Sequence, residues 1–466
     1  MQLSEEEDDD YQLSLSKFES MLKTNKVLFF DSEEFEDIIL HYLDMGKANL
    51  AKKALKLALD QHPKSTGLKL VQVEMLVYDD KLDAADKLLN ELHLLEPRNE
   101  EVYIQKASIC SKRDNHLEAI SLLKTALIYT DDLADVHNLI GMEYLFMDEL
   151  EMAKDNFIKC LDEDPEDQAS LYNVVYCFEF LDQNEQAIVY LNAYIDKNPY
   201  SEIAWHQVGR LYYGLKQYHE AIRAFDFATI IDDEFMGAFM EKAKAHERVK
   251  EYEKAIEDYN RTIELDDATS YALLRIGKCN ERLGNKSLAL KYYNKTVHED
   301  PLLDKGWIAI TDFYVREKNF TKALYFSNKA ISIDNQNAQY WKRYATINRK
   351  INNFEDAEFG YRKAVELGDT KLDTWLFWTD ILQFQGEFDM AINTLLQALA
   401  FFADESEIEY RLAGLYVMSD ETEKATFHLS NALRQNYENH SILINLFPVV
   451  WSRKEVKSLV GKYKNL

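Results

Sequence analysis

The chain has 466 residues, of which 47% are hydrophobic and 12% aromatic, with only 14 glycines and 6 prolines. So few turn-forming residues exclude collagen-like and disordered classes and argue against an all-β or loop-rich α/β protein. The formal net charge of −28 opposes general binding to polyanions such as duplex nucleic acid or anionic lipid, so any cationic site has to be local.

The N-terminal segment carries an acidic run at residues 5–10 and has neither the basic nor the apolar part of a secretory signal. We expect residues 1–10 to form an acidic disordered tail. The alternative is an arm that folds over basic side chains elsewhere in the chain. Residues 11–31 are expected to form a capping helix and its lead-in, with Leu13, Phe18, Met21 and Leu22 on its apolar face.

From residue 32 to residue 439 the sequence repeats with a period of 34 residues. Alanine occupies position 20 of all twelve rows, which begin at residues 32, 66, 100, 134, 168, 202, 236, 270, 304, 338, 372 and 406. Five of the six prolines share position 32, and four of the six tryptophans share position 4. This regularity predicts a repeat array that fills most of the chain.

Each row has the pattern of two helices. Apolar residues at positions 4, 7, 8 and 11, and again at 20, 24 and 27, predict two amphipathic helices. Position 15 holds Gly, Asp or Asn in nine of the twelve rows, and these residues end helices and turn the chain. Small residues at positions 8, 20 and 27 allow two helices to cross closely. Each row is therefore predicted to be an antiparallel helical hairpin.

This pattern resembles the tetratricopeptide repeat. The row at residues 202–235 matches it at Trp205, Gly209, Tyr212, Ala221 and Phe225. The resemblance implies an all-α solenoid of helical hairpins, wound as a right-handed superhelix with short capping helices at both ends. In general likeness, the chain is similar to uncharacterised cytoplasmic bacterial proteins of this family, of the kind found in Bacteroidota.

Residues 440–466 continue the frame as a degenerate thirteenth row. We expect them to form a C-terminal capping repeat, because a solenoid has to cover its apolar ends. Pro448 lies inside what would be the first helix of this row, and Leu459 stands in place of the alanine. A kinked cap is therefore expected.

Catalytic and cofactor motifs are missing from the sequence. The flanks are too short for a catalytic domain, and the Gly-Asn-Lys-Ser segment at residues 284–287 lacks the first glycine of a phosphate-binding loop. No histidine pair has metal-ligand spacing, and four scattered cysteines suit packing in a reducing compartment. We predict a non-enzymatic, cytoplasmic protein with no cofactor, no metal and no membrane insertion.

The array offers a binding surface. In tetratricopeptide proteins the first helix of each repeat lines a concave groove, so the resemblance implies that repeat positions 2, 5, 6, 9, 12 and 13 face a partner. The candidate groove residues are Tyr172, Asn173, Tyr176, His206, Arg210, Tyr213, Lys244, Arg275, Lys278, Lys342 and Arg343.

Position 9 carries a basic ladder of Arg210, Lys244 and Lys278, which suits an acidic peptide with tyrosines stacked beside it. The alternative is ordinary solvated surface. At position 13, Arg248 and Arg282 can instead complement the helix dipole. No three consecutive rows carry the lysine and asparagine set with which co-chaperones of this family clamp a terminal carboxylate.

The predicted function is a non-catalytic scaffold or adaptor that binds an extended or helical segment of a partner protein in the groove. Two alternatives remain open. One is RNA association through the basic stripe and its interleaved tyrosines, which the net charge opposes. The other is self-assembly through the terminal caps.

Overall fold

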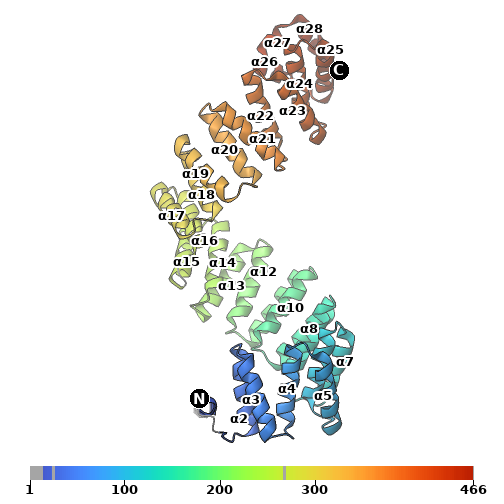
Figure 1. Ribbon diagram of the computed structural model, residues 1–466. Helices are drawn as coiled ribbons and strands as arrows, with labels where there is room; N and C mark the ends of the chain where they lie inside the picture. Colours follow the sequence, from blue (N-terminus) through green and yellow to red (C-terminus); the bar gives the residue numbers. More distant parts are fainter. Residues whose placement is uncertain (1–13, 24–26, 266–268, 465–466) are drawn as a thin grey trace. The chain divides into compact units, whose positions relative to one another are not determined.

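The computed structural model describes residues 14–23, 27–265 and 269–464, so the acidic run at residues 5–10 lies outside the described residues. Within the described ranges the chain forms helices and turns and no strand, which confirms the all-α prediction. The chain divides into two compact units, unit 1 (Met1–Leu215) and unit 2 (Lys216–Leu466). Figure 1 shows consecutive helix pairs in each unit.

In unit 1, residues 14–23 are helical, and Phe18 packs against Phe30 and against Phe35 and Tyr42 of the first hairpin. The helices that follow are α2 (Ser32–Asp44), α3 (Ala48–Gln61), α4 (Thr66–Tyr78), α5 (Leu82–Leu95), α6 (Glu100–Lys112), α7 (His116–Ala126), α8 (Leu133–Phe146), α9 (Leu150–Glu163), α10 (Gln168–Phe180), α11 (Asn184–Lys197) and α12 (Glu202–Gly214).

Unit 2 continues with helix pairs and ends in shorter helices. Its helices are α13 (Tyr218–Ile231), α14 (Met236–Arg248), α15 (Tyr252–Leu265), α16 (Ser270–Arg282), α17 (Lys286–Glu299), α18 (Asp304–Arg316), α19 (Phe320–Ile333), α20 (Ala338–Lys350), α21 (Phe354–Glu366), α22 (Leu372–Gln385), α23 (Phe388–Phe401), α24 (Ser406–Met418), α25 (Thr422–Gln435), the 3-10 helix η1 (Tyr437–His440), α26 (Ser441–Leu446), α27 (Pro448–Ser452) and α28 (Lys454–Tyr463).

The recurrent small residues lie where the two helices of a hairpin approach each other. All twelve position-20 alanines are buried, and only Ala425 has any exposed surface, at 4%. A Cβ added to Gly141 in α8 would lie 2.7 Å from Phe157 Cε1 of α9. These crossings leave no room for a larger side chain, because the interior is packed to van der Waals contact.

A hydrogen bond joins position 4 of one row to position 32 of the row before it. The indole nitrogens of Trp205 and Trp307 donate to the carbonyl oxygens of Pro199 and Pro301, at 3.0 and 2.9 Å. Each bond ties the start of a hairpin to the turn that precedes it. Trp341 donates in the same way to the carbonyl oxygen of Asn335 at 2.9 Å, so the contact accounts for the aromatic residues at position 4 and does not require proline at position 32.

The turn inside each hairpin uses one residue in the left-handed conformation. Position 15 has a positive φ, between 56° and 81°, in all twelve rows, and in nine of them the residue is not glycine. Three of these are Lys216, Lys250 and Lys318, which the sequence pattern did not identify as turn residues. Left-handed backbone is unfavourable for lysine, so the packing of the two helices imposes the turn there.

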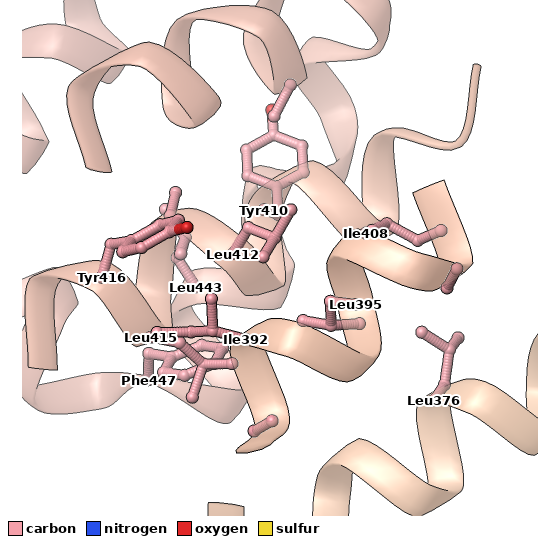
Figure 2. Close-up of a cluster of buried hydrophobic side chains, with 14 of the residues drawn as sticks. Leu376, Ile392, Leu395, Ile408, Tyr410, Leu412, Leu415, Tyr416, Leu443 and Phe447 are labelled. Atoms are coloured by element: carbon pink, nitrogen blue, oxygen red, sulfur yellow. The ribbon is translucent and has the colours of Figure 1, made fainter. Parts of the chain in front are cut away.

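The C-terminal end departs from the hairpin pattern. Pro448 is the first residue of α27, so the chain breaks between α26 and α27 instead of bending within one helix. Figure 2 shows Leu443 and Phe447 packed against α24. Eleven of the thirteen α24 residues are buried, because α23 and α25 also pack against this helix. Three short helices, α26, α27 and α28, thus follow the last regular hairpin and pack on it.

Candidate functional site

Several first helices of neighbouring hairpins contact one another. In unit 1, α2 contacts α4, α4 contacts α6, and α10 contacts α12; in unit 2, α16 contacts α18. The sequence prediction assigns repeat positions 2, 5, 6, 9, 12 and 13 of the first helices to one side of each unit. We call this side the groove face.

A pocket of 880 Å³ opens on the groove face of unit 2. We call it the cationic pocket, because six of its lining residues are basic and three are acidic, on a protein whose net charge is −28. Its walls come mainly from α14, α16 and α18. The lining residues are Glu247, Arg248, Lys250, Tyr252, Arg275, Lys278, Glu281, Arg282, Tyr293, Ala309, Asp312 and Arg316.

Each acidic residue of the cationic pocket is paired with an arginine from a neighbouring repeat. Glu247 accepts two hydrogen bonds from Arg275, at 2.8 Å from Nε and 2.5 Å from Nη2. Asp312 accepts from Arg343 Nε at 2.9 Å. Glu281 pairs with Arg316. The three carboxylates thus have their positive partners within the fold.

Two of these carboxylates also accept hydrogen bonds from buried tyrosines. Tyr259 Oη donates to Glu247 at 2.7 Å, and Tyr293 Oη donates to Glu281 at 3.0 Å. Burial, and then the adjacent carboxylate, raises the pKa of both phenols, so both stay neutral donors. Sequence reasoning missed this arrangement, although Glu at position 12 and Tyr at position 24 recur in two consecutive rows.

Three cations of the pocket form no ion pair among the described residues: Lys278 and Arg282 on α16, and Lys250 in the turn after α14. Within the part of the chain that the structure describes, neither Lys278 nor Arg282 forms an ion pair or a hydrogen bond. Lys278 is half-buried, and burial followed by the nearby charge of Arg275 lowers the pKa of its amine. Arg282 is exposed one helical turn further along α16.

The other members of the predicted basic ladder have internal contacts. In unit 1, Arg210 Nη1 donates to Gln207 at 2.7 Å, and Arg210 Nη2 lies 3.7 Å from Glu179. In unit 2, Lys244 Nζ lies 5.6 Å from the centre of the Tyr271 ring. Lys278 is therefore the ladder residue whose positive charge is not engaged by an internal contact among the described residues.

Further along unit 2, Lys342 forms ion pairs with two aspartates. Its amine lies 2.6 Å from Asp373 Oδ1 and 3.6 Å from Asp369 Oδ2, and its side chain is 15% exposed. Together with the Arg275 and Arg343 pairs, this contact shows that three of the predicted groove cations already link neighbouring repeats. Pairs of this kind orient side chains more than they add net stability.

The groove face of unit 1 is aromatic. Tyr172 and Tyr176 are 40% and 41% exposed, and the Tyr176 ring centre lies 4.3 Å from that of Phe180. Phe146 and Phe180, both at position 13, are 59% and 66% exposed. Sequence reasoning missed these two phenylalanines, although their regular spacing in consecutive rows was visible.

The remaining predicted groove residues of unit 1 are less accessible. Asn173 Nδ2 lies 3.7 Å from the Met142 sulfur of the preceding repeat. Tyr213 is half-buried. His206 was expected on the surface but is only 8% exposed, because α10 packs against α12. Its ring therefore offers little area to a partner.

A second pocket, of 420 Å³, holds a buried charged network in unit 2. Lys242 Nζ lies 2.8 Å from Asp226 and 3.2 Å from Asp258, and His246 Nδ1 lies 2.8 Å from Glu251. Burial raises the pKa of Asp258 to about 6, although Lys242 opposes the shift. Burial also lowers the pKa of His246.

Two searches for further sites cover only the described residues. Over residues 14–23, 27–265 and 269–464, no group of three His, Cys, Asp or Glu side chains is placed to hold a metal ion. Over the same ranges, no helix has the length and the apolar character needed to cross a bilayer.

Several solved structures are similar to parts of this chain. A tetratricopeptide repeat protein from Parabacteroides merdae is 15% identical over 53% of this chain and 97% of its own, with a TM-score of 0.39. MamA is 17% identical over 36% of this chain and 97% of its own, with a TM-score of 0.33. YrrB, described as a TPR protein with an unusual peptide-binding site, is 16% identical over 38% of this chain and 92% of its own, with a TM-score of 0.32.

The comparison with curated proteins found no match. Family models described as tetratricopeptide repeat match residues 134–167, 208–268 and 240–303. The matched residues belong to helix pairs of the same length and order as those in the rest of the described chain. Residues 134–167 and 208–303 of the chain are tetratricopeptide repeats.

Proposed function

We propose that the protein is a non-catalytic scaffold or adaptor that binds an extended or helical segment of a partner protein on its groove face. The observation that carries the proposal is the cationic pocket of unit 2, which is positive although the protein as a whole is strongly acidic. A local charge of opposite sign to the whole protein selects a charged partner segment over general polyanions.

Two further features of the groove face support this function. Exposed aromatic side chains in unit 1, among them Tyr176 and Phe180, are of the kind that dominates protein interfaces. In unit 2, the walls of the cationic pocket are fixed by ion pairs between neighbouring repeats, such as Arg275 with Glu247. A preorganised surface loses little conformational entropy when a segment binds.

Photo-crosslinking tests the proposal by position. Benzoylphenylalanine replaces Tyr176 or Tyr271, which are 41% and 42% exposed on first helices, in one pair of variants. In the control pair it replaces Tyr325 or Phe427, which are 58% and 63% exposed on second helices. We expect crosslinks to the partner from the first pair only. Crosslinks confined to the control pair would show that partners bind the opposite side.

A further inference from the structure

We infer that the cationic pocket is an oxyanion site, in which Lys278 and Arg282 bind a carboxylate or phosphoryl group carried by the partner segment. The inference rests on the proposed function, because the ligand group arrives as part of a segment bound on the groove face. It adds the chemical class of the ligand and the two side chains that contact it.

The first argument is the pairing of charges inside the pocket. Two lining carboxylates are paired with lining arginines, Glu247 with Arg275 and Glu281 with Arg316. The third, Asp312, is paired with Arg343, which does not line the pocket. Each lining carboxylate thus has an arginine partner, and over the described ranges none of the three forms an ion pair with Lys278 or Arg282. A negative group from another molecule therefore completes the charge balance of the pocket.

The second argument is the state of Lys278. Its amine is half-buried beside Arg275, and both burial and that neighbouring charge disfavour its protonated form, which lowers its pKa. The attraction of Glu247 and Asp312 does not offset these two effects, so the protonated amine is unfavourable at this position. An oxyanion at the amine removes this unfavourable state, so binding is coupled to protonation of Lys278.

The third argument is the geometry of α16. Lys278 and Arg282 are separated by four residues, so both project from the same side of the helix. An ammonium beside a planar guanidinium suits the oxygens of a carboxylate or a phosphoryl group. The pocket volume of 880 Å³ is large enough for a side chain together with the backbone on either side of it.

The net charge of the protein disfavours a nucleic-acid ligand and is compatible with a peptide ligand. A polyanion that extends beyond the pocket meets a protein with a net charge of −28, and repulsion grows with its length. A single acidic or phosphorylated side chain meets only the positive pocket. The pocket therefore favours a protein segment with a local negative charge.

The test uses the full chain and fluorescein-labelled peptides of one length in an anisotropy titration. One peptide carries a central run of glutamates, a second has glutamines at the same positions, and a third has phosphoserines there. The variant Lys278→Gln/Arg282→Gln removes both cations. Lys295→Gln/Lys329→Gln is the matched control, because it removes two exposed charges from the second helices α17 and α19.

We expect the glutamate or the phosphoserine peptide to bind the wild type at least about tenfold more tightly than the glutamine peptide. The advantage should vanish in Lys278→Gln/Arg282→Gln, persist in the control, and persist in Lys278→Arg, which keeps the charge. Whichever acidic peptide binds more tightly identifies the source of the oxyanion. Circular dichroism checks that all variants keep their helix content.

Two results would overturn the inference. One is equal binding of the acidic and glutamine peptides, or equal losses in the two double variants. The other is an oligouridylate that binds more tightly than both acidic peptides and loses affinity in Lys278→Gln/Arg282→Gln, which would assign the pocket to RNA. In the first case, crosslinks from position 271 show whether groove binding itself still holds.

Discussion

The ring of Tyr293 fills the space beside Gly277: a Cβ at Gly277 would lie 2.5 Å from Tyr293 Cε1, too close for any real contact. Tyr293 is 1% exposed and donates to Glu281, so its ring cannot move away easily. Gly277 therefore sets the distance between α16 and α17 beneath the cationic pocket.

This contact predicts that Gly277→Ala destabilises the protein, although alanine is the better helix former. We expect a loss of about 1–3 kcal/mol in the free energy of unfolding, because the added methyl group overpacks the crossing. Gly461→Ala is the control, since a Cβ there meets no atom within 4 Å. Gly461→Ala should raise the free energy of unfolding by about 0.5–1 kcal/mol. Urea unfolding of both variants measures the difference, and a stabilising Gly277→Ala would refute the crossing argument.

Lys318 has a φ of 57° in the turn between α18 and α19. Replacing it with glycine should raise the free energy of unfolding by about 0.5–1 kcal/mol, because glycine adopts left-handed backbone without strain. Lys322→Gly, inside α19, is the control and should cost about 1 kcal/mol. If both substitutions destabilise to the same extent, the turn at position 15 is not strained.

Phe447 is 2% exposed and packs on Gly414 of α24, where it closes the end of the last hairpin (Figure 2). Phe447→Ala should destabilise the C-terminal segment by about 3–5 kcal/mol, because it leaves a cavity in a packed core. Val449→Ala is the comparison, since Val449 is 71% exposed. Amide hydrogen exchange in α24 should speed up in the first variant and stay unchanged in the second. Equal exchange in both would mean that the cap does not protect α24.

The network around Asp258 predicts a pH dependence of stability. Burial raises the pKa of this carboxyl from 3.8 to about 6. The folded state therefore binds the proton more tightly than the unfolded state, and the stability that this proton contributes is lost as pH rises from about 4 to about 6.

Asp258→Asn removes this titration, so the stability of the variant relative to the wild type should increase over the same pH range. Urea unfolding midpoints at several pH values measure the change. Glu253→Gln, at an exposed position of α15, controls for the loss of one negative charge. A constant difference between Asp258→Asn and the wild type from pH 4 to pH 7 would contradict the raised pKa.

The sequence predicts the helix pairs because their constraints recur at fixed positions. Alanine recurs at position 20 in all twelve rows, Gly, Asp or Asn at position 15 in nine, and an aromatic residue at position 4 in seven. The turns at Lys216, Lys250 and Lys318 could not be predicted, because packing overrides the local preference of lysine there.

Less of the candidate site could be predicted. Position numbers identified Arg275, Lys278 and Arg343 as groove residues, but not which of them a neighbouring repeat neutralises. That outcome depends on side-chain directions across two rows, which a period of 34 does not specify. The boundary between the two units, at residues 215 and 216, could likewise not be predicted, because the repeat pattern continues through it unchanged.

The central claim is that partners bind the groove face through its cations. The most direct measurement is affinity capture from the cognate lysate with quantitative mass spectrometry. It compares the wild type with Arg210→Glu/Lys244→Glu/Lys278→Glu and with Lys159→Glu/Lys295→Glu/Lys329→Glu, which makes the same charge change on exposed second-helix residues. We predict that the first variant loses a partner that the second retains. Equal retention by all three proteins would contradict the claim.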